Sequence, residues 1–248
     1  MTVEEVVKRI AAETDKVIEE IKSRDCLLNN TIEKCPEPES FRNYIVTEYW
    51  SDSESVNVFQ ITGTSCSDYD CGISWIDMLR FGKKMSFTLE LLKKNPYYYF
   101  DTAKKIPDMH FTRINDRIYI SGDGNHRTAI AKVLFYYTGN TMLHGIDFTE
   151  YQVDFELKYL FEELERVLYQ KLPYVKAEVI RKCVKREDTA GWKKDYYEVE
   201  VKLINYRNGK EFKIKREQKD LLRKLIDEID GLSFWKKIFK NRLVANVI

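Results

Sequence analysis

Residues 118–139 read IYISGDGNHRTAIAKVLFYYTG, and the pattern changes in the middle of this stretch. Residues 117–121 at its left end are β-branched and aromatic, which predicts a short strand. Its right end predicts a helix that stops at Gly139, because four apolar residues fall on one helical face: Ile130, Val133, Leu134 and Tyr137. Between the two lies the turn GDGNHRT, residues 122–128. We therefore expect a strand that enters a helix through two glycines.

The side chains of this turn suit a phosphate group. A helix start offers free N–H groups and the positive end of the helix dipole, and glycines allow a ligand to approach the backbone. Arg127 could hold an oxyanion, His126 could donate a hydrogen bond or move a proton, and Asp123 could bind a metal ion or act as a base. The alternative is a glycine turn whose acid caps the helix while the two bases pair with carboxylates. Turn chemistry alone leaves both interpretations open.

The segment GDGNHRTAIAK resembles the signature of the ParB/sulfiredoxin-like superfamily, in which a strand leads into G-x-x-R-x-x-A or D-G-x-H-R at a helix start. Gly124, Arg127 and Ile130 have the G-x-x-R-x-x spacing, whereas the alanine falls at Ala129 or Ala131. The resemblance covers residues 85–147. It implies a nucleotide or phosphate site, since members include CTP-dependent partition proteins, sulfiredoxins, a free-serine kinase and DNA nucleases. The residues expected to bind the ligand are Gly122, Gly124, Asn125, Arg127 and Thr128.

Two departures narrow this resemblance. Sulfiredoxins carry a cysteine directly before the histidine of this turn, where the present chain has Asn125, so the thiolate of that chemistry is missing. Partition proteins begin near a Leu/Pro-rich strand and carry a helix-turn-helix, whereas here about 80 residues of different character come first and no such reader follows. We therefore expect neither the thiol chemistry of sulfiredoxins nor a role in chromosome partition.

Composition indicates an ordinary folded protein in the cytoplasm. Of 248 residues, 44% are hydrophobic and 33% are charged, and no apolar run reaches the ~18 residues of a membrane span. The N-terminus is charged and amphipathic, unlike a signal peptide. The odd number and irregular spacing of the cysteines fit reduced thiols, and the Cys66-x₄-Cys71 pair lacks the partners of a metal site; the five are Cys26, Cys35, Cys66, Cys71 and Cys183.

Residues 2–25 are predicted to form one helix, with Thr2 and Glu5 as a capping box. Its apolar seam has heptad spacing and comprises Val3, Val7, Ile10, Thr14, Val17 and Ile21. The seam could mediate a homodimer or pack on its own domain. We favour the second, since three heptads are marginal for an independent coiled coil.

The middle of the chain predicts alternating short elements. Strands are expected at 44–50, 55–61 and, around an Asn115-Asp116 turn, at 110–114 and 117–121. Helices are expected at 73–80, 87–94 and 147–169, the second capped by Ser86 and ended by Asn95-Pro96. The aromatic run at 97–100 could stack a base, although such runs more often fill a core. Glu48 and Asp52 are candidate acids to join Asp123.

Beyond Leu172-Pro173 the chain predicts a small α+β region. Strands are expected at 175–184, 196–204 and 212–214, the last joined through an Asn208-Gly209 turn, with helices at 217–230 and 234–239. Residues 171–248 hold 21 basic and 12 acidic residues, a net charge of +9, against −8 for residues 1–170. This asymmetry suggests a polyanion such as DNA as a partner of the C-terminal region, and the alternative is an ordinary solvated face of lysines.

Together these observations predict an α+β protein with three parts: an N-terminal helix (1–34), a ParB/sulfiredoxin-like phosphate- or nucleotide-binding domain (40–170) and a basic C-terminal domain (171–248). The leading hypothesis is phosphate chemistry associated with DNA, either hydrolysis of a nucleoside triphosphate or phosphodiester cleavage. Asp123, with Mg²⁺, and His126 and Arg127 would be the catalytic residues. The alternatives are a small-molecule kinase of the serine-kinase type, and a non-catalytic regulator that binds DNA or protein.

Overall fold

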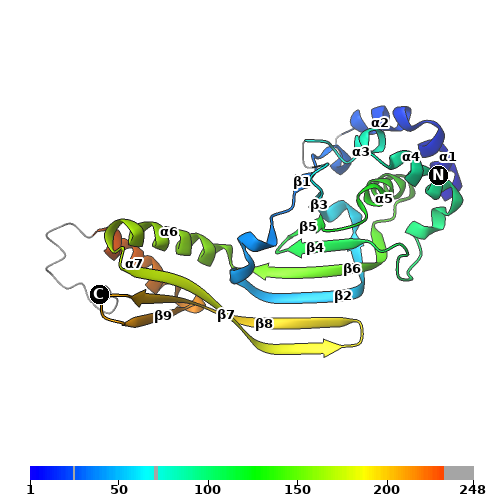
Figure 1. Cartoon of the computed structure of the whole chain (residues 1–248). Helices are drawn as coiled ribbons and strands as arrows, with labels where there is room; N and C mark the ends of the chain where they lie inside the picture. The colour runs from blue at the N-terminus through cyan, green and yellow to red at the C-terminus, as the bar shows by residue number, and fades with distance from the viewer. Residues whose placement is uncertain (25, 70–71, 232–248) are drawn as a thin grey trace. The chain divides into compact units, whose positions relative to one another are not determined.

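The computed structural model describes residues 1–24, 26–69 and 72–231 (Figure 1). In these ranges the chain forms seven α-helices and nine strands of a mixed sheet, which confirms a mixture of helices and sheet. Asp25, Cys71 and the predicted helix at 234–239 lie outside the described residues. None of the described helices combines the length and the apolar character needed to cross a membrane.

The chain divides into two compact units, each assembled from several segments. Unit 1 comprises Met1–Glu37, Tyr49–Tyr151 and Asp188–Lys193. Unit 2 comprises Pro38–Glu48, Gln152–Glu187 and the chain from Lys194 onward. The predicted boundaries, placed near 34–40 and at 170/171, divide the chain differently and stay predictions.

In unit 1 five strands are neighbours in the order β1 (Glu33–Lys34), β3 (Ile61–Thr64), β5 (Arg117–Ile120), β4 (His110–Ile114) and β6 (Met142–Val153). β3 runs parallel to both β1 and β5, and β4 runs parallel to β6. β4 and β5 form the predicted antiparallel hairpin, with Phe111 opposite Ile120 and a turn in which Asn115 has a φ of 51°. The strand that leads into the glycine turn therefore lies inside the sheet.

Five helices of unit 1 lie together on one side of this sheet (Figure 1). They are α1 (Val3–Ala12), α2 (Thr14–Lys22), α3 (Met78–Phe81), α4 (Met85–Lys94) and α5 (Asn125–Thr138). α5 begins directly after the glycine turn and ends at Gly139, whose φ is 78°, as predicted. Its middle is buried on all sides, from Thr128 to Phe135. α5 is thus the central helix of unit 1, and the turn at its start is held by the core on one side.

Two expectations for the N-terminal helix meet different outcomes. The capping box of Thr2 and Glu5 is confirmed. The single helix is wrong, since the chain breaks at Glu13, with φ −129° and ψ 38°, into α1 and α2. The break lets both apolar faces reach one core: Val7, Ile10, Val17 and Ile21 are all buried within unit 1. Those side chains are therefore not available for a coiled coil, while the oligomeric state stays untested.

Three further predictions of local structure are wrong. The two strands expected over residues 44–61 are one long strand, β2 (Ile45–Asn57), followed by a 3-10 turn (Val58–Gln60) that Asn57 caps through the amide of Phe59. Ser86 lies inside α4, whose N-cap is Lys84. The helix expected over residues 147–169 starts only at Phe155, since the residues before it belong to β6. Short apolar runs carry too little periodicity to separate strand from helix.

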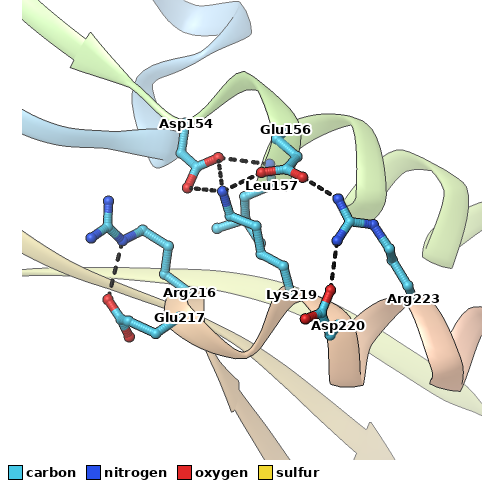
Figure 2. Close-up of polar contacts among 8 residues, drawn as sticks. All are labelled: Asp154, Glu156, Leu157, Arg216, Glu217, Lys219, Asp220 and Arg223. Atoms are coloured by element: carbon cyan, nitrogen blue, oxygen red, sulfur yellow. Dashed lines mark hydrogen bonds and ion pairs between the residues drawn. The ribbon is translucent and has the colours of Figure 1, made fainter.

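Unit 2 contains α6 (Phe155–Lys171), α7 (Lys219–Asp230), β9 (Glu211–Lys215) and most of β7 (Val175–Thr189) and of β8 (Trp192–Asn205), whose residues 188–193 belong to unit 1. β8 and β9 are antiparallel, with Val201 opposite Ile214, as the Asn-Gly turn predicted. Figure 2 shows how charged residues join α6 and α7: Lys219 Nζ lies 2.8 Å from Asp154 and 2.6 Å from Glu156, and Arg223 also contacts Glu156. Asp154 additionally caps α6 by accepting from the amide of Leu157 at 2.9 Å. These contacts lie beside the apolar interface of the two helices.

Candidate functional site

A pocket of about 340 Å³ lies in unit 1 at the start of α5. One part of its wall is apolar and the other part is polar. The apolar residues are Phe87, Leu91, Leu92, Tyr98, Tyr99, Ile106 and Pro107. The polar side chains that carry the argument below are Lys84, Lys94, Asp123, Asn125, His126 and Arg127. Such a wall suits a small ligand with one charged and one apolar end.

Gly124 shapes the polar end of this pocket. It is the N-cap of α5 with a φ of 129°, and no side chain caps the helix. A Cβ at this position would lie 3.1 Å from the Met109 side chain. The amide of Thr128 closes the first helical turn on the Gly124 carbonyl at 2.7 Å. In the described part of the chain the amides of residues 125–127 find no acceptor, so they remain for a ligand.

His126 lines the pocket with one edge of its ring fixed by neighbours. Its Nε2 lies 2.8 Å from the Tyr69 hydroxyl and accepts from the amide of Lys84 at 3.3 Å. Burial, then the positive charges of Lys84 and Arg127, lower the pKa of His126, while Asp123 raises it more weakly than burial lowers it. The imidazole is therefore neutral at pH 7.

Arg127 lines the same pocket, but most of its guanidinium is already used by the chain. It donates to the carbonyls of Pro107 and, at 2.7 Å, Asp108, and to the Tyr98 hydroxyl at 2.7 Å. Only 13% of the side chain is exposed. The arginine thus holds residues 107–108 against the start of α5 while it contributes positive charge to the pocket. This role could not be predicted from the sequence, because every residue carries a backbone carbonyl and no residue type marks the ones that Arg127 contacts.

The remaining predicted ligand-binding residues separate into two groups. Asn125 lines the pocket and is held by Thr64, whose hydroxyl donates to Asn125 Oδ1 at 2.7 Å. Gly122 lies outside the pocket lining, at a place where a Cβ would meet His110 at 3.2 Å. Thr128 is fully buried, its hydroxyl has no hydrogen-bond partner among the residues that the structure describes, and it does not line the pocket. The pocket therefore brings together Asp123, Gly124, Asn125, His126 and Arg127.

Asp123 is the one carboxylate among the described residues that line the pocket. Its side chain is 82% exposed and lies 3.9 Å from Arg127 Nη2. Glu48 and Asp52 do not line the pocket, and Glu48 accepts from Arg181 at 3.3 Å within unit 2. Asp123 could give Mg²⁺ one ligand, so phosphate oxygens and water would have to supply the others.

A second group of metal-ligand side chains lies elsewhere in unit 1. Ligand atoms of Asp108, His110 and Asp147 lie within 4.8 Å of one another. Lys104 pairs with Asp147, however, and already supplies positive charge there. The group therefore carries no metal assignment.

Sequence reasoning missed the contribution of α4. Lys84, Phe87, Thr88 and Leu91 follow helical spacing and all line the pocket. Phe87 is 65% and Leu91 43% exposed, so the apolar wall is open to solvent. Lys84 and Lys94 form no ion pair with any residue that the structure describes. The signal in the sequence was an amphipathic helix with exposed apolar residues between two lysines.

The aromatic run at 97–100 serves two purposes. Tyr99 is 2% exposed and belongs to the core, as expected. Tyr98 lines the pocket and receives the hydrogen bond of Arg127. The expectation of a core role is thus correct for Tyr99, although both tyrosines line the pocket.

No protein-family model, no curated protein and no solved structure matches this chain. The interpretation of the site therefore rests on its residues and on their geometry.

Proposed function

We propose that this protein binds a small phosphate-bearing molecule of the nucleotide type in the pocket at the start of α5. The phosphate lies at the free amides of residues 125–127, and the flat apolar part of the ligand lies against α4 and Tyr98. The resemblance of the glycine turn to the ParB/sulfiredoxin-like signature agrees with this proposal.

One observation carries it: among the described residues, helix-start amides without an acceptor and two lysines without an ion pair open into a single amphipathic pocket. Amides alone occur at every helix start. Here Lys84 and Lys94 add two charges, and neither lysine forms an ion pair with a described carboxylate, although Lys94 interacts at longer range with Glu90. A bound anion would interact with both groups, because it accepts hydrogen bonds from the amides and is attracted by the ammonium groups.

The apolar wall argues for more than inorganic phosphate. Phe87, Leu91 and Tyr98 offer surface that a bare phosphate would leave in water. A nucleobase buries such surface and stacks on aromatic rings. The size of the pocket, about 340 Å³, is in the range of small-molecule sites.

Turnover is a separate proposal with less support. Hydrolysis of a nucleoside triphosphate or cleavage of a phosphodiester needs a group that orients water or a metal ion, and Asp123 is the carboxylate at hand. A small-molecule kinase needs a further base, and neither Glu48 nor Asp52 lines the pocket. The binding role therefore stands ahead of either reaction.

Titration calorimetry with ATP, CTP and inorganic phosphate, each with and without Mg²⁺, tests the binding proposal. The double variant Lys84→Ala/Lys94→Ala should weaken nucleotide binding roughly 10-fold or more, since two charge-assisted contacts are lost. The matched control is Lys8→Ala/Lys224→Ala, which removes two exposed lysines outside the pocket. Equal affinities in the two double variants, or no binding by the wild type, would refute the proposal.

Binding of DNA by the C-terminal region also remains a proposal. Many basic residues there are paired in the structure, among them Lys202 with Glu211 and Lys213 with Glu200. Exposed lysines without an ion pair among the described residues include Lys182, Lys210 and Lys224. Changing these three to Glu should abolish DNA retention at low salt if the region binds DNA. Unchanged DNA retention would show that these lysines of the C-terminal region do not bind DNA.

A further inference from the structure

The surroundings of His126 fix more than its position. Lys83 and Lys84 present successive backbone amides to Tyr69 and His126: the amide of Lys83 donates to the Tyr69 hydroxyl at 3.2 Å, and that of Lys84 donates to His126 Nε2 at 3.3 Å. The Tyr69 hydroxyl itself lies 2.8 Å from Nε2. Two hydrogen bonds therefore meet at Nε2 of the imidazole, and a third holds the Tyr69 hydroxyl in place.

A backbone N–H can only donate, so these contacts determine which atoms accept the hydrogen bonds. Nε2 must be an acceptor to receive the amide of Lys84, and a proton on Nε2 would face that N–H directly. Tyr69 receives the amide of Lys83, which leaves its own proton free to donate to Nε2. In a neutral imidazole the proton then lies on Nδ1.

The ring cannot easily turn to exchange its two nitrogens. Tyr69 packs edge-on against it, with ring centroids 5.5 Å apart. On another side, a Cβ at Gly82 would lie only 2.7 Å from His126 Cδ2, so the backbone of residue 82 approaches the ring closely. Nδ1 has no partner among the residues that the structure describes, and His126 lines the pocket. Nδ1 is the ring nitrogen left for a ligand.

We infer that Tyr69 and the amides of Lys83 and Lys84 hold His126 as the neutral Nδ1–H tautomer, which donates a hydrogen bond to the phosphate of the bound ligand. Tyr69 is then a positioning residue of the site, although it does not line the pocket. The inference rests on the proposed function for the identity of the ligand, but the tautomer itself does not depend on it. Of the two roles that the sequence left open for His126, hydrogen-bond donation and proton transfer, it favours the first.

Two pairs of variants test this inference. Tyr69→Phe keeps the ring packing and removes the hydroxyl, whereas the control Tyr119→Phe removes the hydroxyl of another buried tyrosine of unit 1. In the second pair, His126→Asn places an amide N–H near the former Nδ1, and His126→Gln extends it toward the former Nε2. The probes are ATP and inorganic phosphate, measured by calorimetry, together with ¹⁵N spectra of the histidine ring without ligand.

The expected spectrum of the wild type at neutral pH shows one tautomer, protonated on Nδ1. Tyr69→Phe should introduce the second tautomer and weaken ATP binding roughly 2- to 10-fold, while Tyr119→Phe changes neither. His126→Asn should bind ATP more tightly than His126→Gln. A wild-type ring protonated on Nε2 would overturn the tautomer, and a Tyr69→Phe spectrum like that of the wild type would overturn the positioning role of Tyr69.

The opposite order of the Asn and Gln variants would overturn the donor role. If the wild type binds neither probe, the proposed function fails and the donor role falls with it, whereas the ring spectrum still decides the tautomer. The two failures can thus be told apart.

Discussion

The first turn of α5 and its middle each carry a basic side chain that is largely covered by the protein. The two side chains differ in how many acceptors they have. Arg127 in the first turn donates to two carbonyls and a hydroxyl, with 13% of its side chain exposed. Lys132, farther along the helix, is 1% exposed, donates to the Ile61 carbonyl at 3.0 Å and lies 4.5 Å from the centre of the Trp75 ring. An arginine keeps its charge because several acceptors fit its planar donor group. A lysine with one acceptor gives up its proton more easily.

The comparison teaches that a basic residue near a pocket is not by itself a ligand contact. Arg127 lines the pocket and yet serves the chain's own backbone, whereas Lys84 and Lys94 on α4 have no such partners among the described residues. Motif reasoning selects the arginine, while the free charges are on another helix. Four experiments examine this difference.

The largest effect is expected from Arg127→Ala. Its removal leaves the Tyr98 hydroxyl and two carbonyls without their donor, so the protein should lose about 2–4 kcal/mol of stability in urea unfolding. Arg117→Ala is the control, since that arginine forms an exposed pair with Glu33 and should cost about 0–1 kcal/mol. If Arg127→Ala instead keeps full stability and loses only ligand affinity, the arginine is a ligand contact and the comparison fails.

Lys132 should make stability depend on pH. Burial lowers its pKa from 10.5 to about 7, so between these values the unfolded chain binds a proton that the folded chain has lost. Stability should therefore rise with pH across this window, by something on the order of 3 kcal/mol between pH 7 and 9.5. Below pH 7 Lys132 is protonated in both states, so the cost of burying its charge no longer changes with pH. Lys132→Met should remove this rise, and parallel curves for wild type and variant would show that the lysine stays charged.

Gly124 and Gly139, at the two ends of α5, offer a third test. Gly124→Ala should cost about 1–3 kcal/mol, because a φ of 129° is strained for alanine and its Cβ would press on Met109. Gly139→Ala meets no neighbour within 4 Å at a φ of 78° and should cost about 1 kcal/mol. Ligand affinity should fall only in the first variant, as measured by calorimetry. A loss in both would indicate that the pocket depends on the whole helix.

The smallest effect is expected from His126 in mild acid. Its pKa is lowered in the folded protein, so the unfolded chain takes up this proton first as the pH falls through the ordinary value of 6.5. Stability should decline over that interval and level off below the folded pKa. His126→Asn should flatten this part of the unfolding profile, whereas an unchanged slope would assign the decline to other groups.

The sequence predicted the fold where the local signals were strong. The hairpin around Asn115 and the helix from the glycine turn to Gly139 are as expected, because turn residues and helical spacing agree there. The break at Glu13 was not predictable, since the helical pattern runs through it and only packing in the core requires it. Likewise, residues 147–153 belong to β6 because this strand pairs with β4. No local pattern in the sequence reveals that pairing.

Only the part of the candidate site that lies in one continuous segment was predicted from the sequence. The turn GDGNHRT identified five residues that line the pocket, because they are consecutive in the chain. Lys84, Phe87 and Tyr98 come from other segments that the fold brings to the turn, and spacing along the chain cannot show this. The same holds for Tyr69, whose role depends on the position of a single hydroxyl.

The division of the chain has a consequence for how the protein is made. Unit 1 takes its last segment, Asp188–Lys193, from beyond a long stretch of unit 2, and Trp192 of that segment packs against Tyr49 with ring centroids 6.1 Å apart. During synthesis at ~5–20 residues per second, the ribosome must add roughly 40 residues after Tyr151, over about 2–8 s, before this segment exists. Until then the emerging chain holds the whole glycine turn but only an incomplete unit 1. A fragment that stops at residue 170 would repeat that unfinished state permanently.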